Sequence, residues 1–206
     1  MEKLDKLINT ISNNIKLSGL PGAKGQSLMA PSIRNTSTFK TNKQEKEAAV
    51  LILLYEKNNI LKTVFTKRHS YEGPHGGQIS LPGGKREPVD KNLIETALRE
   101  TEEELGIPNS QIIPIHSLTS LHIPVSNINV TPIVAYTKKR IEFIPDIREV
   151  NFIIECPLNL LKDEKIRKTE ILRINNIEIN APYFDIDSNH IWGATAMIMS
   201  EFIQLF

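Results

Sequence analysis

The sequence predicts an α/β/α sandwich, and three features of its apolar pattern lead to this fold class. Short runs rich in β-branched and aliphatic residues, bounded by polar turns, predict strands. A helix lies between these strands in the chain, and an amphipathic segment near each end predicts two further helices. Strands surrounding a central helix, with helices at both ends, fit a sandwich in which each element buries an apolar side.

The first predicted element is an amphipathic helix, whose apolar residues recur at helical spacing: Leu4, Leu7, Ile8, Ile11 and Ile15. Residues 18–46 contain prolines and glycines among polar residues and predict a loop, which either wraps the domain or meets a second subunit in a homodimer. Strands are expected at 48–55 and 60–67, joined by a polar turn at 57–59. Residues 68–80, rich in glycine and histidine, predict another loop.

The central helix is predicted over residues 91–105. Asp90 is expected to cap its N-terminus, Gly106 stands where a left-handed residue ends a helix, and Pro108 prevents continuation. An apolar stripe at helical spacing is expected to face the core: Ile94, Ala97, Leu98, Thr101 and Leu105.

After the central helix, four more strands are expected, at residues 112–119, 130–136, 150–155 and 171–179. A final helix is predicted over residues 192–205, with Ala196, Met199 and Ile203 on its apolar side.

Three glutamates in the last turns of the central helix carry the clearest functional signal. At the helical period, Glu100, Glu103 and Glu104 fall within an arc of roughly 100° on one side, clear of the apolar stripe. Like charges at these spacings repel, and the helix macrodipole disfavours anions near the C-terminus. Carboxylates gathered in this way suit a hard divalent cation such as Mg²⁺, which takes oxygen ligands. The alternative is a solvated acidic face, which the Pro-Gly-Gly turn at 82–84 disfavours.

Composition indicates one ordinary globular domain, residues 1–206, with an N-terminal extension at 1–46 and a core at 47–206. The chain has 25 Lys and Arg against 24 Asp and Glu, so its net charge of +1 attracts neither nucleic acid nor membranes. Its N-terminus is not a signal peptide, and its apolar runs are too short for a membrane span. Cys156 is the only cysteine, which excludes an intrachain disulfide, favours a buried apolar role and predicts a cytoplasmic protein.

Residues 81–107 resemble the signature of the Nudix hydrolases, in which two glycines, an early glutamate and Arg-Glu-x-x-Glu-Glu occur at fixed spacing. The spacing from Gly84 to Arg99 is one residue longer than in that signature, and the early glutamate falls on Asp90. Both departures are typical of the coenzyme A pyrophosphatase-like branch. The matching residues are Gly84, Arg99, Glu100, Glu103, Glu104, Gly106 and Ile107.

An upstream segment and a C-terminal segment also resemble that branch. The upstream matches are Thr66, Arg68, Gly77, Pro82, Gly83 and Gly84. Residues 191–196, Ile-Trp-Gly-Ala-Thr-Ala, resemble a C-terminal segment common in the branch. Gly73 replaces an arginine of the upstream pattern, which leaves the choice of substrate open.

The resemblance implies a Nudix-type α/β/α sandwich with a mixed sheet and a catalytic strand–loop–helix motif. It implies Mg²⁺, with Mn²⁺ as a substitute, as the cofactor. Glu100 and Glu104 are the expected metal ligands, with Glu103 holding a second ion or a bound water, and a carbonyl of the glycine turn, at Gly84, adding a ligand. Arg99 is expected to hold a carboxylate in one rotamer. Glu149, which precedes a predicted strand, is the candidate general base, and its alternative is an exposed loop acid.

Basic residues flank the glycine turn and are candidates for phosphate binding: Arg68, Lys85 and Arg86, with Arg34 reaching in from the N-terminal loop. His69 and His75 are placed to touch substrate. Trp192 either stacks on an adenine or belongs to the core.

The resemblance predicts hydrolysis of the pyrophosphate bond of a nucleoside diphosphate derivative, first of all coenzyme A or acyl-CoA, to 3′,5′-ADP and 4′-phosphopantetheine. One alternative is the same reaction on ADP-ribose, NADH or a dinucleotide. An alternative of another class is a nucleotide-sensing binding protein without catalysis. The intact acidic triplet argues against that class, because such a protein has no use for mutually repelling carboxylates.

Overall fold

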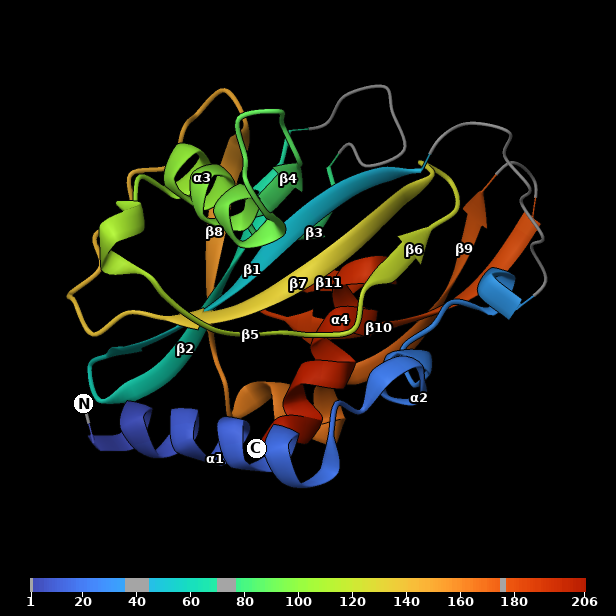
Figure 1. Cartoon of the computed structure of the whole chain (residues 1–206). Helices are drawn as coiled ribbons and strands as arrows, with labels where there is room; N and C mark the ends of the chain where they lie inside the picture. Colours follow the sequence, from blue (N-terminus) through green and yellow to red (C-terminus); the bar gives the residue numbers. More distant parts are fainter. Residues whose placement is uncertain (1, 36–44, 70–76, 175–176) are drawn as a thin grey trace.

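The structure is a computed structural model that describes residues 2–35, 45–69, 77–174 and 177–206 (Figure 1). The α-helices of this part of the chain are α1 (Glu2–Ser18), α2 (Gly22–Ser27), α3 (Leu93–Leu105) and α4 (Gly193–Phe202). Its short 3₁₀ helices are η1 (Ser32–Asn35), η2 (Asn109–Gln111), η3 (Leu160–Lys162), η4 (Glu164–Ile166) and η5 (Ile203–Leu205).

Most of the strands belong to one large mixed sheet. They are β1 (Lys46–Lys57), β2 (Ile60–Arg68), β3 (Ile79–Ser80), β4 (Gly83–Lys85), β5 (Ile113–Ser117), β6 (Leu121–Ile123), β7 (Ile128–Tyr136) and β8 (Val150–Pro157). The main order is β3-β2-β1-β7-β5, in which β1 runs parallel to β7 and antiparallel to β2 and β4. The predicted mixed α/β fold class is therefore confirmed.

Strand β1 divides the core into two layers, because successive side chains of a strand point to opposite faces. Ala48, Ile52 and Leu54 join a cluster with apolar residues of α1 and α4. Ala49, Leu51, Leu53 and Tyr55 join a second cluster with Ala97 and Leu105 of α3. Figure 1 shows the result, with α3 on one side of the sheet and α1 and α4 on the other.

A second sheet of β9 (Arg167–Ile174), β10 (Ile177–Ile186) and β11 (Asn189–Trp192) was not predicted. The single strand expected at 171–179 is wrong, because this segment contains parts of β9 and β10. Ile174 pairs with Ile177, so the chain reverses within the predicted strand. Apolar residues alternate with polar ones on both sides of residues 175–176, so the pattern alone does not reveal that the chain reverses.

Several predicted boundaries also change. The loop expected at 18–46 contains α2 and η1, and the loop expected at 68–80 begins inside β2 and ends with β3. The final helix ends as α-helix at Phe202 and continues as η5, while β6 and β11 were not foreseen. These elements are short and depend on tertiary contacts more than on a local pattern.

Helix α3 begins at Leu93 and not at residue 91. Asn92 is its N-cap, accepting a hydrogen bond from the Glu95 backbone N–H at 3.0 Å, so the cap predicted at Asp90 is wrong. Ile94 is 37% exposed and does not belong to the buried stripe. Gly106 ends the helix with φ 69° and confirms the predicted left-handed position.

A buried glutamate in α4 explains why the short helix α2 forms. The Glu201 carboxylate is 0% exposed and accepts hydrogen bonds from Gln26 Nε2 at 2.8 Å and from the backbone N–H of Gly22 and Thr119, each at 3.2 Å. It thereby joins the N-terminal segment, the turn before β6 and the last helix. Buried polar groups need such partners, since an unpaired one is costly.

Within the described ranges, we find no helix that is both long and apolar enough to cross a lipid bilayer.

We predict that Glu201→Ala lowers the free energy of unfolding by about 2–4 kcal/mol, because it leaves several buried donors without an acceptor. Urea unfolding followed by circular dichroism measures this change. The matched control is Glu178→Ala, which removes an exposed pair with Arg173 and should change stability by less than about 1 kcal/mol. Equal effects of the two substitutions would contradict the role assigned to Glu201.

Candidate active site

The site is built around the glycine turn that leads into β4. Gly83 pairs with Val50 of β1 and has φ 149°, where a Cβ would collide with the Ala49 carbonyl oxygen and the Val50 backbone. A Cβ on Gly84 would overlap the Glu100 carboxylate. Only glycine lets the sheet on one side and the carboxylate on the other approach this backbone so closely.

Glu104 lies deepest among the glutamates of α3, at 1% exposure. Its carboxylate accepts hydrogen bonds from the Gly83 backbone N–H and from Arg68 Nη2, the latter at 3.1 Å. The expectation that all three acids lie clear of the buried side of the helix is therefore wrong for Glu104. The helical phase is as expected, but β2 and the glycine turn cover this part of the helix and enclose the carboxylate.

The electrostatics of Glu100 and Glu104 follow from this enclosure. Burial raises the pKa of Glu104 to about 7, against the opposing charge of Arg68. Burial also raises the pKa of Glu100, while Arg99 lowers it. The charge of Glu149 contributes to the raised pKa of both groups, so Glu149 lies within electrostatic range of them.

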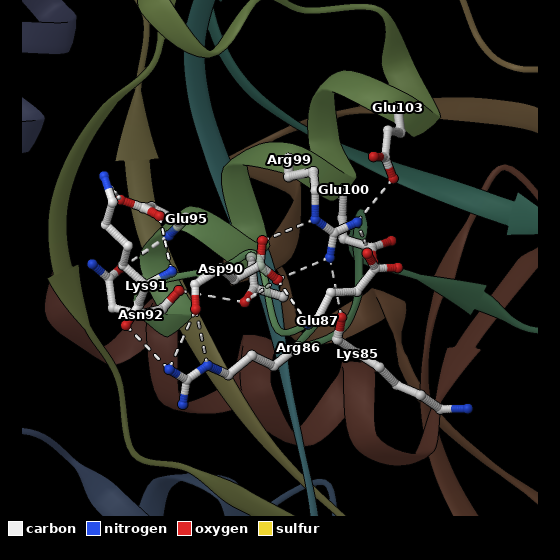
Figure 2. A network of polar contacts seen from close by, with 11 residues as sticks. Lys85, Arg86, Glu87, Asp90, Lys91, Asn92, Glu95, Arg99, Glu100 and Glu103 are labelled. Carbon is white, nitrogen blue, oxygen red and sulfur yellow. Dashed lines mark hydrogen bonds and ion pairs between the residues drawn. The ribbon is translucent and has the colours of Figure 1, made fainter.

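Arg99 connects the helix to the glycine turn (Figure 2). Its Nε and Nη2 donate to the two carboxylate oxygens of Asp90, each at 3.0 Å, and Nη2 also donates to the Lys85 carbonyl at 3.1 Å. Its Nη1 lies 3.0 Å from Glu100 Oε1 and 3.0 Å from Glu103 Oε2. The expected pairing of Arg99 with a carboxylate is present, and it fixes the orientation of Glu100 beside Gly84.

Asp90 supports Arg99 from a buried position. Its carboxylate also accepts from the Glu87 backbone N–H at 2.9 Å and from Thr96 Oγ1 at 3.0 Å. The Arg99 guanidinium, with these two donors, holds the pKa of Asp90 well below its usual range. Sequence reasoning missed this role, because Asp90 is also a good capping residue. The available signal was that Asp90 is an acid that lies nine positions before Arg99 in the sequence.

The predicted basic residues differ in their surroundings. Arg68 is engaged with Glu104, and Arg86 donates to Glu47 at 2.8 Å and to the Asp90 and Lys91 carbonyls. The Lys85 ammonium has no partner among the described residues, and Figure 2 shows its side chain extending away from the network. The Arg34 backbone lies in η1, and its side chain is outside the described part of the structure.

A hollow of about 740 Å³ borders the turn on the side of Lys85. Its volume is in the range of small-molecule sites. It is lined by Glu45, Lys46, Glu47, Lys85, Arg86, Glu87, Pro88 and Asp90.

The remaining candidates lie around this centre. Glu149 is exposed in the turn before β8, and His69 Nε2 lies 2.8 Å from the Ile147 carbonyl oxygen. His75 and Gly73 fall outside the described residues. Cys156 is buried, and burial raises the pKa of its thiol to about 12, which agrees with an apolar role.

The donor set suits a hard divalent cation. Carboxylate oxygens of Glu100 and Glu104 and the carbonyls of the glycine turn are hard ligands, and the lack of a Cβ on Gly84 lets the Glu100 carboxylate lie against the turn. In the described ranges, no three Asp, Glu, His or Cys side chains surround one point. Arg68 and Arg99 instead occupy carboxylate oxygens of Glu104 and Glu100.

Comparison with known proteins identifies the family. The NUDIX domain family matches residues 45–170. The Nudix hydrolase 15, mitochondrial, of Arabidopsis thaliana is 34% identical over 184 residues, which cover 84% of this chain and 62% of that protein. An uncharacterized Nudix hydrolase, NudL, of Yersinia enterocolitica is 33% identical over 169 residues, covering 81% of this chain and 84% of that protein. The chain therefore belongs to the Nudix family, as the resemblance predicted.

Solved structures agree on the fold. A MutT/nudix family protein from Enterococcus faecalis superposes with a TM-score of 0.50 at 16% identity, covering 84% of this chain and 67% of that chain. The coenzyme A pyrophosphatase-like branch stays a prediction. The chain spans about three fifths of the Arabidopsis relative, 62% of its length.

We predict that Asp90→Asn destabilises the protein by about 3 kcal/mol at neutral pH, because it removes the charge that compensates a largely buried guanidinium. The folded-state pKa of Asp90 is lowered, so its stabilising contribution is fully present above the usual carboxyl pKa of about 4 and is lost as the pH falls below it. The difference between wild type and variant should therefore shrink under acid, as measured by urea unfolding at several pH values. Asp5→Asn, which removes an exposed pair with Lys138, is the control, and a pH-independent difference for Asp90→Asn would contradict the assignment.

Proposed function

We propose that this protein is a Mg²⁺-dependent hydrolase that cleaves the pyrophosphate bond of a nucleoside diphosphate derivative. The observation that carries the proposal is the placement of Glu100 and Glu104 against a turn that needs glycine at position 83, while Gly84 lets the Glu100 carboxylate approach. Membership of the Nudix family, in which divalent metal ions are the general cofactor, supports the same reaction class.

The residues that would hold the cation are Glu100, Glu104 and the Gly84 carbonyl, with Glu103 on the exposed side of the helix. When bound there, the cation would supply positive charge to the diphosphate oxygens and would make water more acidic. Mn²⁺, which takes similar oxygen ligands, is the expected substitute.

The other residues of the chain position the reaction. Arg99, fixed by Asp90 and the Lys85 carbonyl, keeps the Glu100 carboxylate facing the turn. Lys85 lines the hollow, and its ammonium, which has no partner among the described residues, is available to a phosphate oxygen. Glu149 is the proposed general base: its carboxylate accepts the proton of the attacking water, since it is exposed and its charge acts on both glutamates.

The proposed substrate is coenzyme A or an acyl-CoA, which would yield 3′,5′-ADP and 4′-phosphopantetheine. This choice is supported by the resemblance of residues 81–107 and 191–196 to the coenzyme A pyrophosphatase-like branch. ADP-ribose, NADH or a dinucleotide is the alternative, because Gly73 replaces an arginine of that pattern. A reducing cytoplasmic location and a homodimer are further proposals, which follow from the lone cysteine and the N-terminal extension.

The test is a panel of coenzyme A, ADP-ribose, NADH and diadenosine polyphosphates, with product release measured with and without Mg²⁺. We expect metal-dependent release of phosphate-ended products, fastest from coenzyme A. Binding of these nucleotides without any turnover, both with and without Mg²⁺, would favour the nucleotide-sensing alternative.

We predict that Glu104→Gln lowers turnover about 100-fold or more, because it removes a charged oxygen ligand from the centre of the site. The fold should remain intact, since an amide oxygen can still accept from Arg68 and from the Gly83 N–H, and one buried charge is lost. Glu102→Gln, an exposed neighbour on the same helix, is the matched control and should keep wild-type turnover. Wild-type turnover in Glu104→Gln would remove Glu104 from the site.

We predict that Gly84→Ala leaves the fold intact and lowers turnover about 100-fold, because the new methyl group displaces the Glu100 carboxylate while the backbone is undisturbed. Turnover and thermal unfolding, measured together, separate an effect on the site from an effect on the fold. An active variant would show that the close approach of Glu100 to the turn is dispensable.

A further inference from the structure

Arg68 is bound to one carboxylate oxygen that would hold the metal and to the backbone carbonyl next to the proposed carbonyl ligand. Its Nη2 lies 3.1 Å from Glu104 Oε1 and 3.0 Å from the Gly83 carbonyl oxygen. Glu104 is a proposed metal ligand, and Gly83 belongs to the turn that supplies the carbonyl ligand. One guanidinium nitrogen therefore bridges the carboxylate and the turn in the way a cation would.

Arg68 is held less firmly than Arg99. Arg99 is 19% exposed and is anchored by both oxygens of Asp90 and by the Lys85 carbonyl, apart from its contacts with Glu100 and Glu103. Arg68 is 32% exposed, and within the described part of the chain only its Nη2 makes hydrogen bonds. Besides Glu104, the Gly83 carbonyl is the one hydrogen-bond partner of this side chain among the described residues, so few contacts oppose its movement.

A divalent cation and the Arg68 guanidinium compete for the Glu104 carboxylate. Two positive charges at contact distance repel, and the low polarity around a buried carboxylate strengthens that repulsion. A cation that displaces the guanidinium leaves its donors free for another anion beside the metal. The anion expected beside the metal is the diphosphate of the substrate, which a guanidinium can bind through two nitrogens.

We propose that Arg68 is a tethered counter-ion that occupies the metal-binding carboxylate of Glu104 until a divalent cation displaces it toward the substrate diphosphate. The inference rests on the proposed function, since it takes Glu104 as a metal ligand. Arg68 then has two successive partners, Glu104 without metal and a phosphate with it. Metal binding and diphosphate binding are thereby coupled, and by thermodynamic linkage each must strengthen the other.

Calorimetric titration of Mn²⁺ into the protein without nucleotide provides the first test. Arg68→Gln should bind Mn²⁺ about tenfold more tightly than wild type, because the competing charge is gone. Arg68→Lys retains a positive charge and should stay nearer to wild type. Arg148→Gln, which loses an exposed guanidinium paired with Asp146, controls for net charge and should match wild type. If Arg68 only supported the fold of the site, Arg68→Gln would bind the metal equally or more weakly, and the proposal would be overturned.

The second test uses adenosine α,β-methylene diphosphate, a diphosphate that is not hydrolysed. Without metal, wild type and Arg68→Gln should bind it equally, because Arg68 is engaged with Glu104. With saturating Mn²⁺, Arg68→Gln should bind it about tenfold more weakly than wild type. If Arg68→Gln lost the same affinity for the diphosphate with and without metal, Arg68 would be available to the diphosphate at all times. This result would overturn the proposed displacement of Arg68 by the cation.

These titrations separate failure of the inference from failure of the proposed function. Metal-dependent turnover with no gain of Mn²⁺ affinity in Arg68→Gln would refute the counter-ion role and keep the enzyme. A gain of affinity without turnover on any substrate would keep the counter-ion role and refute the hydrolase. Thermal unfolding checks that Arg68→Gln is folded. If Arg68→Gln does not fold, the second test is repeated with Arg68→Lys, whose ammonium should lower the affinity for the diphosphate only when metal is present.

Discussion

The structure depends on one constraint: carboxylates are enclosed beside a backbone that has no room for a side chain. Gly83 is fixed against β1, and Gly84 faces Glu100, so the sheet, the turn and helix α3 meet with no intervening Cβ. Enclosed acids are unfavourable, because burial disfavours their charged form. The raised pKa values of Glu100 and Glu104 reflect this unfavourable burial of charge. A cation bound at the same place is expected to compensate it.

Two arginines balance these acids by different means. Arg99 belongs to a rigid network that reaches from α3 through Asp90 to the turn, so it sets geometry. Arg68 comes from β2 and meets α3 across 36 positions of sequence, so the packing of strand against helix decides whether it reaches Glu104. The same packing supplies the apolar layer around Ala97 and Leu105 that holds the helix on the sheet.

Much of this arrangement could be predicted from the sequence. The period of α3, its end at Gly106 and the grouping of its glutamates on one side are local properties, and local rules describe them well. The burial of Glu104 could not be predicted, because helical phase assigns a side but not the element that covers it. Asn92 and Asp90 are both good caps, so only the structure decides between them. The pairing of β9 with β10 was missed because apolar and polar residues alternate on both sides of residues 175–176, so the segment resembles one strand.

The hydrogen bonds of the buried Glu201 carboxylate have a consequence for how the chain folds. Its side-chain donor, Gln26, is separated from it by 175 positions, so the two groups cannot meet until the chain has been synthesised as far as residue 201. Contacts of such long range are slow to form, because a large loop must close first. Helix α2 gains these partners only at that point, and we infer that the amino-terminal segment docks late, after the sheet around β1 has formed.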